Sequence, residues 1–286
     1  MILSRQNTKK ERFMPHIFIF RDAELYCHHT IDMTPDPAGF SMHAHERLEI
    51  YYFISGSGSY LVEGNQYPLH PHDILIMRQA EAHKLLVEAG TPYERIAIHF
   101  SPSLIRGIDP QQRLLRPFLD RPLGQGNLYA AAEDPAGRLR TAFSAFSFEP
   151  GTDVRLNLTG RLLLLLSTLS GIYETREKKP TLPEGLQGKL VAYVNAHLFE
   201  DISLERVADA FFRSRSQVAR IFHQATGSPL WEYVTIKRLL AARAMIERGE
   251  SAGDACTACG FSDYSVFYRA YKAYFSHSPK ADMIKK

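Results

Sequence analysis

The sequence predicts a two-domain protein, with an N-terminal all-β jelly-roll barrel followed by a helical dimerisation element, and a C-terminal all-α tandem helix-turn-helix. Three observations predict this fold class. The first hundred residues contain short runs rich in Ile, Tyr, Phe and Val, separated by Gly, Pro, Asn and Asp. A leucine-rich helical pattern follows, and a pair of short amphipathic helices then occurs twice. A length of 286 residues suits two domains of ordinary size.

Residues 15–110 are expected to form the barrel, because they contain eight runs of strand type with turn residues between them. Eight short strands are typical of a jelly roll or small barrel. The runs are HIFIF, YCHHTIDM, LEIYYFI, GSYLVEG, NQYPL, DILIM, HKLLVEA and RIAIHF.

Histidine and glutamate residues in this region have a spacing that could bring them together as metal ligands. His43, His45 and Glu49 share one face of an extended strand, because side chains alternate with period two. With His83 from a later strand they offer three imidazoles and a carboxylate, which suit Fe, Mn, Ni or Zn. The spacing resembles the first cupin motif, and His83 stands where the second cupin motif places its histidine. The resemblance implies a cupin-like barrel.

Residues 111–178 are predicted to be helical and connecting, with an irregular Pro/Gly-rich stretch from Arg116 to Gly126. From Val154 to Tyr173 the apolar side chains recur at three or four residues, which predicts a long helix with one buried face. That face packs either on the barrel or against the same helix of a second subunit. Glu174 to Glu184 has the composition of an interdomain linker. The apolar stripe consists of Leu158, Leu162, Leu165, Leu169 and Ile172, widened by Leu163 and Leu166.

The C-terminal residues contain the repeated helix pair. In the first copy the apolar stripes are Leu204, Val207, Ala208, Phe211 and then Val218, Ile221, Phe222, Ala225; in the second they are Ala252, Ala255, Cys256, Cys259 and then Phe267, Ala270, Tyr271, Tyr274. Helices joined by so short a turn cross steeply, and the second of each pair can enter a DNA major groove. Ser214 and Gln217 form a capping box at the start of the first recognition helix, Gly227 ends it, and Gly260 relieves the second turn.

The outer faces of the two recognition helices carry side chains suited to phosphates and base edges. We expect them to contact DNA. They are Ser214, Arg215, Ser216, Ala219 and Arg220 in the first helix, and Tyr264, Ser265, Tyr268, Arg269 and Lys272 in the second.

Over residues 186–280 the sequence resembles the AraC family of bacterial transcription regulators. The resemblance rests on ISLERVADAFFRSRSQVARIF, GSPLWEYVTIKRLLAARAMI and GDACTACGFSDYSVFYRAYKAYFSHSP. It implies two recognition helices held by one linker helix, reading major-groove segments about 34 Å apart on double-stranded DNA. The resemblance also favours packing of the leucine stripe against the same helix of a second subunit, and hence a homodimer.

Three positions depart from the family pattern. Phe212 and Arg213 stand where the first turn usually has a small or polar residue and then an aliphatic one, and Ser276 replaces a late glycine. An arginine at a usually buried turn position places the geometry of the first unit in question.

Charge and cysteine content set further bounds. Residues 180–286 contain 14 Lys and Arg against 11 Asp and Glu, while residues 1–179 contain 20 of each, so the net charge of +3 lies in the DNA-binding part. This excess is modest, so affinity must come from placed contacts and dimerisation. Cys256 and Cys259 are spaced C-x-x-C, but both lie on an apolar stripe, which favours packing over a redox or zinc role.

Three cysteines form no even framework, which favours a reducing cytoplasm. The first 13 residues lack the apolar core of a signal peptide, and no run approaches the ~18 to 20 apolar residues of a membrane span. We therefore expect a cytoplasmic protein without a membrane partner.

The function expected is that of a DNA-binding transcription regulator, not an enzyme, with a small-molecule effector in the barrel, which the resemblance implies to be sugar-related. His43, His45, Glu49, Tyr51 and His83 are the predicted effector ligands, with Phe53 beside Tyr51, and no cofactor is expected. RNA polymerase is a further partner if the protein activates transcription. One alternative is a metal-dependent cupin enzyme that uses His43, His45, Glu49 and His83 and is tethered to DNA. Another is a constitutive DNA binder with an empty barrel.

Overall fold

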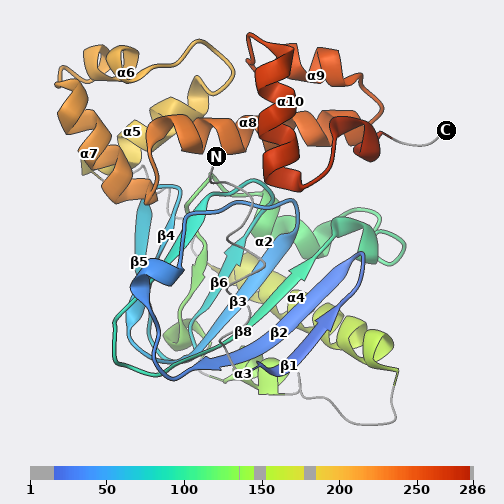
Figure 1. The fold of residues 1–286 in the computed structure, drawn as a ribbon. Helices are drawn as coiled ribbons and strands as arrows, with labels where there is room; N and C mark the ends of the chain where they lie inside the picture. Colours follow the sequence, from blue (N-terminus) through green and yellow to red (C-terminus); the bar gives the residue numbers. More distant parts are fainter. Residues whose placement is uncertain (1–15, 135, 145–152, 177–184, 284–286) are drawn as a thin grey trace.

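The computed structural model describes residues 16–134, 136–144, 153–176 and 185–283. Two sheets form the N-terminal barrel, and the C-terminal helices lie along one end of it (Figure 1). The strands are β1 His16–Arg21, β2 Leu25–Asp32, β3 Leu48–Ser55, β4 Gly58–Val62, β5 Asn65–Pro68, β6 Ile74–Met77, β7 His83–Val87, β8 Tyr93–Phe100 and β9 Leu128–Tyr129. The α-helices are α2 Arg116–Leu119, α3 Arg138–Ser144, α4 Val154–Thr175, α5 Gly185–Ala196, α6 Leu204–Ala210, α7 Arg215–Thr226, α8 Leu230–Glu247, α9 Ala252–Ala258 and α10 Tyr264–Phe275.

The barrel is built from antiparallel pairs. One sheet has the strand order β1-β2-β8-β3-β6-β9, and the other has the order β5-β4-β7. Between them lies an apolar core that includes Tyr51, Phe53, Leu75, Met77 and Leu85. All eight predicted strands are present, and the structure adds β9, which pairs with β6 from inside the region expected to be helical.

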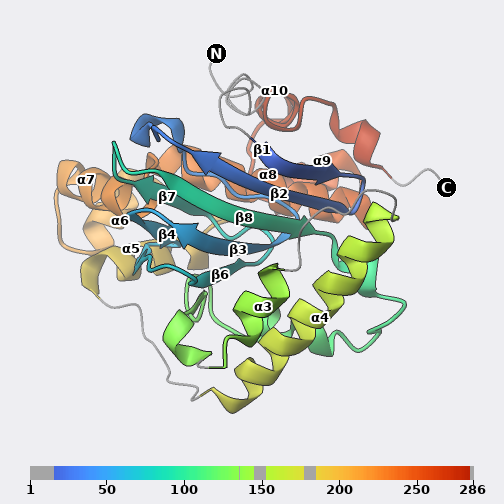
Figure 2. The ribbon, with the colours of Figure 1, turned by 90° about the horizontal axis from the view of Figure 1, so that it is seen from below.

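The other face of the six-stranded sheet is covered by helices. Figure 2 shows α3 and α4 lying along this face. The predicted leucine stripe of α4 packs here, with Leu162, Leu165 and Leu169 fully buried among Ile50, Ile98 and other side chains of the sheet. The expectation that this stripe forms a seam between subunits is therefore wrong, because the chain's own sheet covers it.

Helix α4 is long and apolar enough to cross a membrane by length and composition alone, a property that it shares with core helices of soluble proteins. Its position under the sheet accounts for the apolar stripe that is buried there, whereas Leu156 and Leu164 on the opposite face are exposed. Asp153 caps its first turn by accepting a hydrogen bond from the amide of Leu156.

The C-terminal helices form the two expected helix-turn-helix units, α6–α7 and α9–α10, joined by the linker helix α8. Both sets of predicted apolar stripes face the interior. The capping box of Ser214 and Gln217 is present, and Gly227 ends α7 in the left-handed conformation. Gly260 also has a positive φ, and a β-carbon there would lie 2.5 Å from the carbonyl oxygen of Phe199.

The departures from the family pattern lie at the ends of these helices. Phe212 adopts a left-handed conformation with φ of 53° and is 92% exposed, and Arg213 is also exposed. Ser276 caps α10 with φ of 66°. The first turn therefore closes without burying Arg213, and the geometry of the first unit is intact.

Candidate effector pocket and nucleic-acid interface

A row of cross-strand neighbours crosses the inner face of the six-stranded sheet. Tyr26 of β2 pairs with His99 of β8, which pairs with Glu49 of β3. Directly opposed residues on antiparallel strands project to the same side. The Tyr26 and His99 rings are stacked with centroids 5.3 Å apart, and Nδ1 of His99 lies 3.8 Å from the Glu49 carboxylate.

The predicted histidines converge on the same carboxylate. The ligand atoms of His43, His45, Glu49 and His83 all lie within 4.8 Å of one another. The expected single strand does not carry them, because β3 begins only at Leu48 and His43 forms an isolated bridge with His83 instead. Two hydrogen bonds, His43 N–H to His83 O at 3.0 Å and His83 N–H to His43 O at 2.9 Å, hold the two segments together.

Backbone carbonyls orient all three imidazoles in the same way. Nδ1 lies 3.1 Å from Ser41 O in His43, 2.9 Å from Arg47 O in His45, and 2.7 Å from Glu81 O in His83. A carbonyl only accepts, so Nδ1 carries the hydrogen and Nε2 is left to face the cluster. Nε2 of His45 then lies 2.9 Å from Glu49.

Burial controls the electrostatics of the cluster. Burial alone would raise the pKa of Glu49, but the surrounding imidazoles, His99 foremost, hold it well below its ordinary value. Burial lowers the pKa of both His43 and His99 to about 3. The pKa of His83 is also depressed by burial, but its contact with Glu49 outweighs this effect and raises it. The site thus combines one buried carboxylate with two imidazoles, those of His43 and His99, whose lowered pKa keeps them neutral at ordinary pH.

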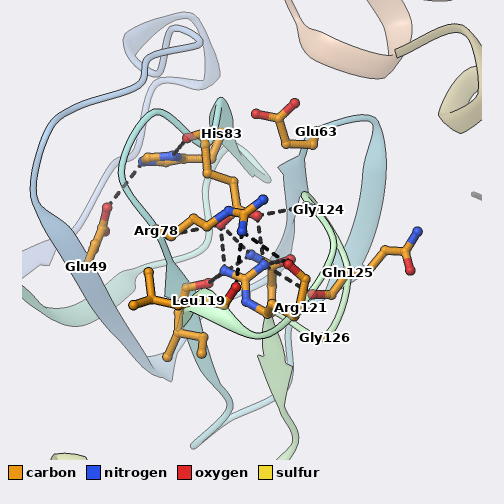
Figure 3. A network of polar contacts seen from close by, with 12 residues as sticks. Glu49, Glu63, Arg78, His83, Leu119, Arg121, Gly124, Gln125 and Gly126 are labelled. Atoms are coloured by element: carbon orange, nitrogen blue, oxygen red, sulfur yellow. Dashed lines mark hydrogen bonds and ion pairs between the residues drawn. The ribbon is translucent and has the colours of Figure 1, made fainter. Parts of the chain in front are cut away.

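A network behind His83 fixes the segment that carries it. The buried Glu81 carboxylate accepts two hydrogen bonds from Arg121, at 2.7 and 2.6 Å, and others from the Gly124 amide and Asn127. Figure 3 shows this network, with Glu49 on one side of His83 and Glu63 on the other. A bidentate arginine pair of this kind gives His83 a rigid support.

The cluster opens to the surface through a hollow of about 270 Å³, lined by Arg21, Tyr26, His45, Arg47 and His99. Sequence reasoning missed all of these residues except His45. Alternation along RIAIHF places His99 on a definite face of its strand, but only the strand register brings that face over Glu49.

Tyr51, the remaining predicted effector ligand, lies deeper in the barrel. It is 1% exposed, and its hydroxyl contacts that of Tyr93. Its ring packs edge-on against Tyr60, whose ring lies 5.9 Å from that of His83. Tyr51 therefore supports the floor of the site and does not line the opening.

The predicted DNA-contacting residues lie on open faces of α7 and α10. Nine of the ten residues, including Ser214, are exposed, and Ala219 is half-buried. Ser214 uses its hydroxyl to cap α7, and Arg215 is held 2.6 Å from Glu205. Arg220 and Arg269 are thus the exposed arginines best placed to reach a groove, and the contacts themselves stay a prediction.

Two family models match these two halves of the molecule. The model of the AraC-like ligand binding domain matches residues 31–166, and a helix-turn-helix domain model matches residues 207–283. The chain belongs to the AraC family. It is an AraC-type DNA-binding transcription regulator with a cupin-like ligand-binding domain.

Relatives of this AraC-family chain include two curated activators. The transcriptional activator RhaS of Enterobacter sp. (strain 638) is 33% identical over 110 residues, which make up 36% of this chain and 40% of that protein. RhaS of Escherichia coli (strain K12) is 24% identical over 251 residues, or 85% of this chain and 87% of that protein.

Similar solved structures include ToxT from Vibrio cholerae, at 12% identity and a TM-score of 0.38 over 90% of this chain and 97% of that one. The DNA-binding domain of AdpA in complex with a target DNA is 26% identical, with a TM-score of 0.31 over 32% of this chain and 85% of that one.

Proposed function

We propose that this regulator responds to a small polar effector, sugar-related as the family resemblance implies, which binds at His43, His45, Glu49 and His83. The observation that carries the proposal is the convergence of these four side chains within 4.8 Å, beneath an opening at the surface of the ligand-binding domain. Hydroxyl groups suit such a site, because they can donate hydrogen bonds to the Glu49 carboxylate and to the Nε2 atoms of neutral imidazoles, all of which accept.

Ligand-dependent stability and DNA binding test this proposal. Duplexes that bind the full chain are first selected from a random pool, and a carbohydrate panel is then screened by thermal shift. A true effector at a hundred times its Kd adds roughly 2.7 kcal/mol of stability, and it changes the affinity for the selected duplex. Glu49→Gln should reduce both responses, whereas Glu88→Gln, at an exposed carboxylate of the same domain, should reduce neither. A panel-wide absence of response, or an equal response in both variants, contradicts the proposal.

We also propose that the chain acts in the cytoplasm as a homodimer and that, if it activates transcription as the name of RhaS says of that relative, it contacts RNA polymerase. The leucine stripe of α4 is buried, so the open face of this helix, which carries Leu156 and Leu164 at 72% and 62% exposure, is the one left for a second subunit. Leu164→Asp should yield a folded monomer in sedimentation experiments. A dimer unaffected by this change places the interface elsewhere.

A second candidate function is that of a metal-dependent cupin enzyme tethered to DNA. The three Nδ1 contacts to carbonyls favour it, because they turn each Nε2 toward the cluster. There Nε2 of His45 contacts Glu49, itself a candidate ligand, and buried Nε2 of His83 has no aligned hydrogen-bond partner. The residues therefore fit a divalent transition metal, held by His43, His45, Glu49 and His83. Such an ion would supply Lewis acidity.

Elemental analysis separates the two candidates. A metal-dependent enzyme copurifies with about one equivalent of iron, manganese, nickel or zinc and loses it in His45→Ala. A protein that lacks metal and turnover, but changes its DNA affinity with a small molecule, fits the sensor alone.

A further inference from the structure

The residues between the pocket histidines face the DNA-binding domain. Ala44 separates His43 from His45, and Ala82 precedes His83. Both alanines are buried in the same apolar cluster as side chains of α5, α7 and α8, including Val191, Phe222 and Tyr233. Alternation along an extended segment explains this arrangement, because successive side chains point to opposite sides. Two segments thus have the pocket on one side and the DNA-binding domain on the other.

Polar contacts join Ala82 to helices α5 and α8 of the DNA-binding domain through Glu63. This buried carboxylate accepts hydrogen bonds from the Ala82 amide at 2.6 Å, from Lys237 at 2.6 Å and from Asn195 at 2.8 Å, and the Tyr233 hydroxyl also donates to it. We call this group, Glu63 with Asn195, Tyr233 and Lys237, the Glu63 clasp. Lys237 and Tyr233 belong to the linker helix α8, so the clasp holds the helix that joins both units.

The Ala44 segment is joined to the second unit. The hydroxyl of Tyr274, on the recognition helix α10, donates to Ala44 O at 2.6 Å. The next residue but one, Glu46, pairs with Arg243 of α8 at 2.9 Å. The backbone hydrogen bonds between His43 and His83 tie the two segments together, so a shift in the backbone of one segment is passed to the other.

We propose that these two segments, residues 42–46 and 81–83, couple the pocket directly to the DNA-binding domain, so that occupancy of the pocket sets how firmly α8 and α10 are held against the barrel. This proposal deepens the proposed effector response and rests on it. A ligand that prefers one position of the histidines must, by linkage, favour one state of the clasp, and the clasp must affect the pocket equally. Couplings of this kind are typically about 5-fold to 150-fold in an equilibrium constant.

Hydrogen exchange of the full chain without DNA tests the coupling in both directions. Glu49→Gln perturbs the pocket without touching α8 or α10, and it should raise amide exchange in Tyr233–Glu247 and Tyr264–Phe275 by about fivefold or more. The double variant Glu63→Gln/Lys237→Met removes the buried charge pair while conserving volume, and it should raise exchange in β3, on the far side of the pocket.

One control and one further variant sharpen the result. Thr257→Val removes a hydroxyl of the second unit that bonds to Gly253 O inside α9, so β3 should exchange as in the wild type. Tyr274→Phe should raise exchange in β3. Effects confined to the mutated domain overturn the coupling.

Binding of the duplex selected above then distinguishes the two proposals. Coupling predicts that the change in DNA Kd caused by Glu49→Gln shrinks by fivefold or more in the Glu63→Gln/Lys237→Met background. Equal changes in both backgrounds contradict it. If no duplex is selected at all, the proposed function fails, while the exchange experiment still decides the coupling.

Discussion

The predicted DNA contacts of α7 and α10 can be tested one side chain at a time. Arg220→Ala and Arg269→Ala should each weaken binding of a selected duplex, by roughly 1 to 3 kcal/mol if the guanidinium contacts a guanine in bidentate fashion. Fluorescence anisotropy measures the effect. Arg106→Ala, at an exposed barrel position, is the matched control. Wild-type affinity and salt dependence in both recognition-helix variants would exclude this docking.

The cysteines give a second prediction at the residue scale. Burial raises the pKa of Cys27 to about 12 and that of Cys259 to about 11, and the pKa of Cys256 is also raised by burial. A raised thiol pKa leaves almost no reactive thiolate at neutral pH. The native protein should therefore react slowly with a thiol reagent, and all three cysteines should react at once in denaturant. A fast-reacting thiol in the native state would show that the strand or helix that carries it opens.

The sequence predicted the centre of the pocket better than its rim. His43, His45, Glu49 and His83 were found because residue type and spacing are local properties of the chain. Arg47 and His99 were not found, because their position depends on the pairing of β8 with β3, and pairing across 50 residues leaves no local signal.

At the scale of elements, α4 offers neighbouring leucines in opposite environments. Leu162 is fully buried against the sheet and Leu164 is 62% exposed. Leu162→Ala should lower the free energy of unfolding by about 2 to 5 kcal/mol, because it leaves a cavity, whereas Leu164→Ala should change the stability of the protomer little. Urea unfolding at a fixed protein concentration measures both. Similar losses in the two variants would mean that α4 is not seated on the sheet as described.

The α6–α7 turn gives a second prediction at this scale. A non-glycine residue in the left-handed conformation costs about 1 kcal/mol, and the ring of Phe212 recovers little of this by burial because it is 92% exposed. Phe212→Gly should therefore raise stability, by up to about 1 kcal/mol after the entropy that glycine adds to the unfolded chain. Thermal unfolding measures the change, and a lower melting temperature would reveal a native contact of the ring.

Elements were predictable where their pattern was strong. The eight strands and both helix pairs carry clear periodicity and turn residues, which is why they could be predicted. The structure contains all of them. The partner of α4 was assigned wrongly, because an apolar stripe shows that a face is buried but not what buries it. The two-residue strand β9 is too short for any pattern to reveal.

At the scale of the whole molecule, the placement of charge predicts how DNA binding depends on salt. The two recognition faces present Arg215, Arg220, Arg269 and Lys272. If all four neutralise phosphates, the plot of log K against log salt should have a slope of about −3.6 per protomer, at −0.9 per phosphate. Anisotropy titrations at several salt concentrations give the slope. A value near zero would exclude these faces as the DNA surface.

The alternation between histidine and alanine in the two coupling segments has a consequence for how such a regulator diversifies. Under the coupling proposed above, substitutions at 43, 45 and 83 should change which ligand is recognised, whereas substitutions at 44 and 82 should change how strongly binding affects the DNA-binding domain. A single-residue insertion between His43 and His45 reverses these roles, because it turns an imidazole toward the helices and an alanine toward the pocket. Along this segment we therefore expect point substitutions to be tolerated and insertions or deletions to disrupt the regulator.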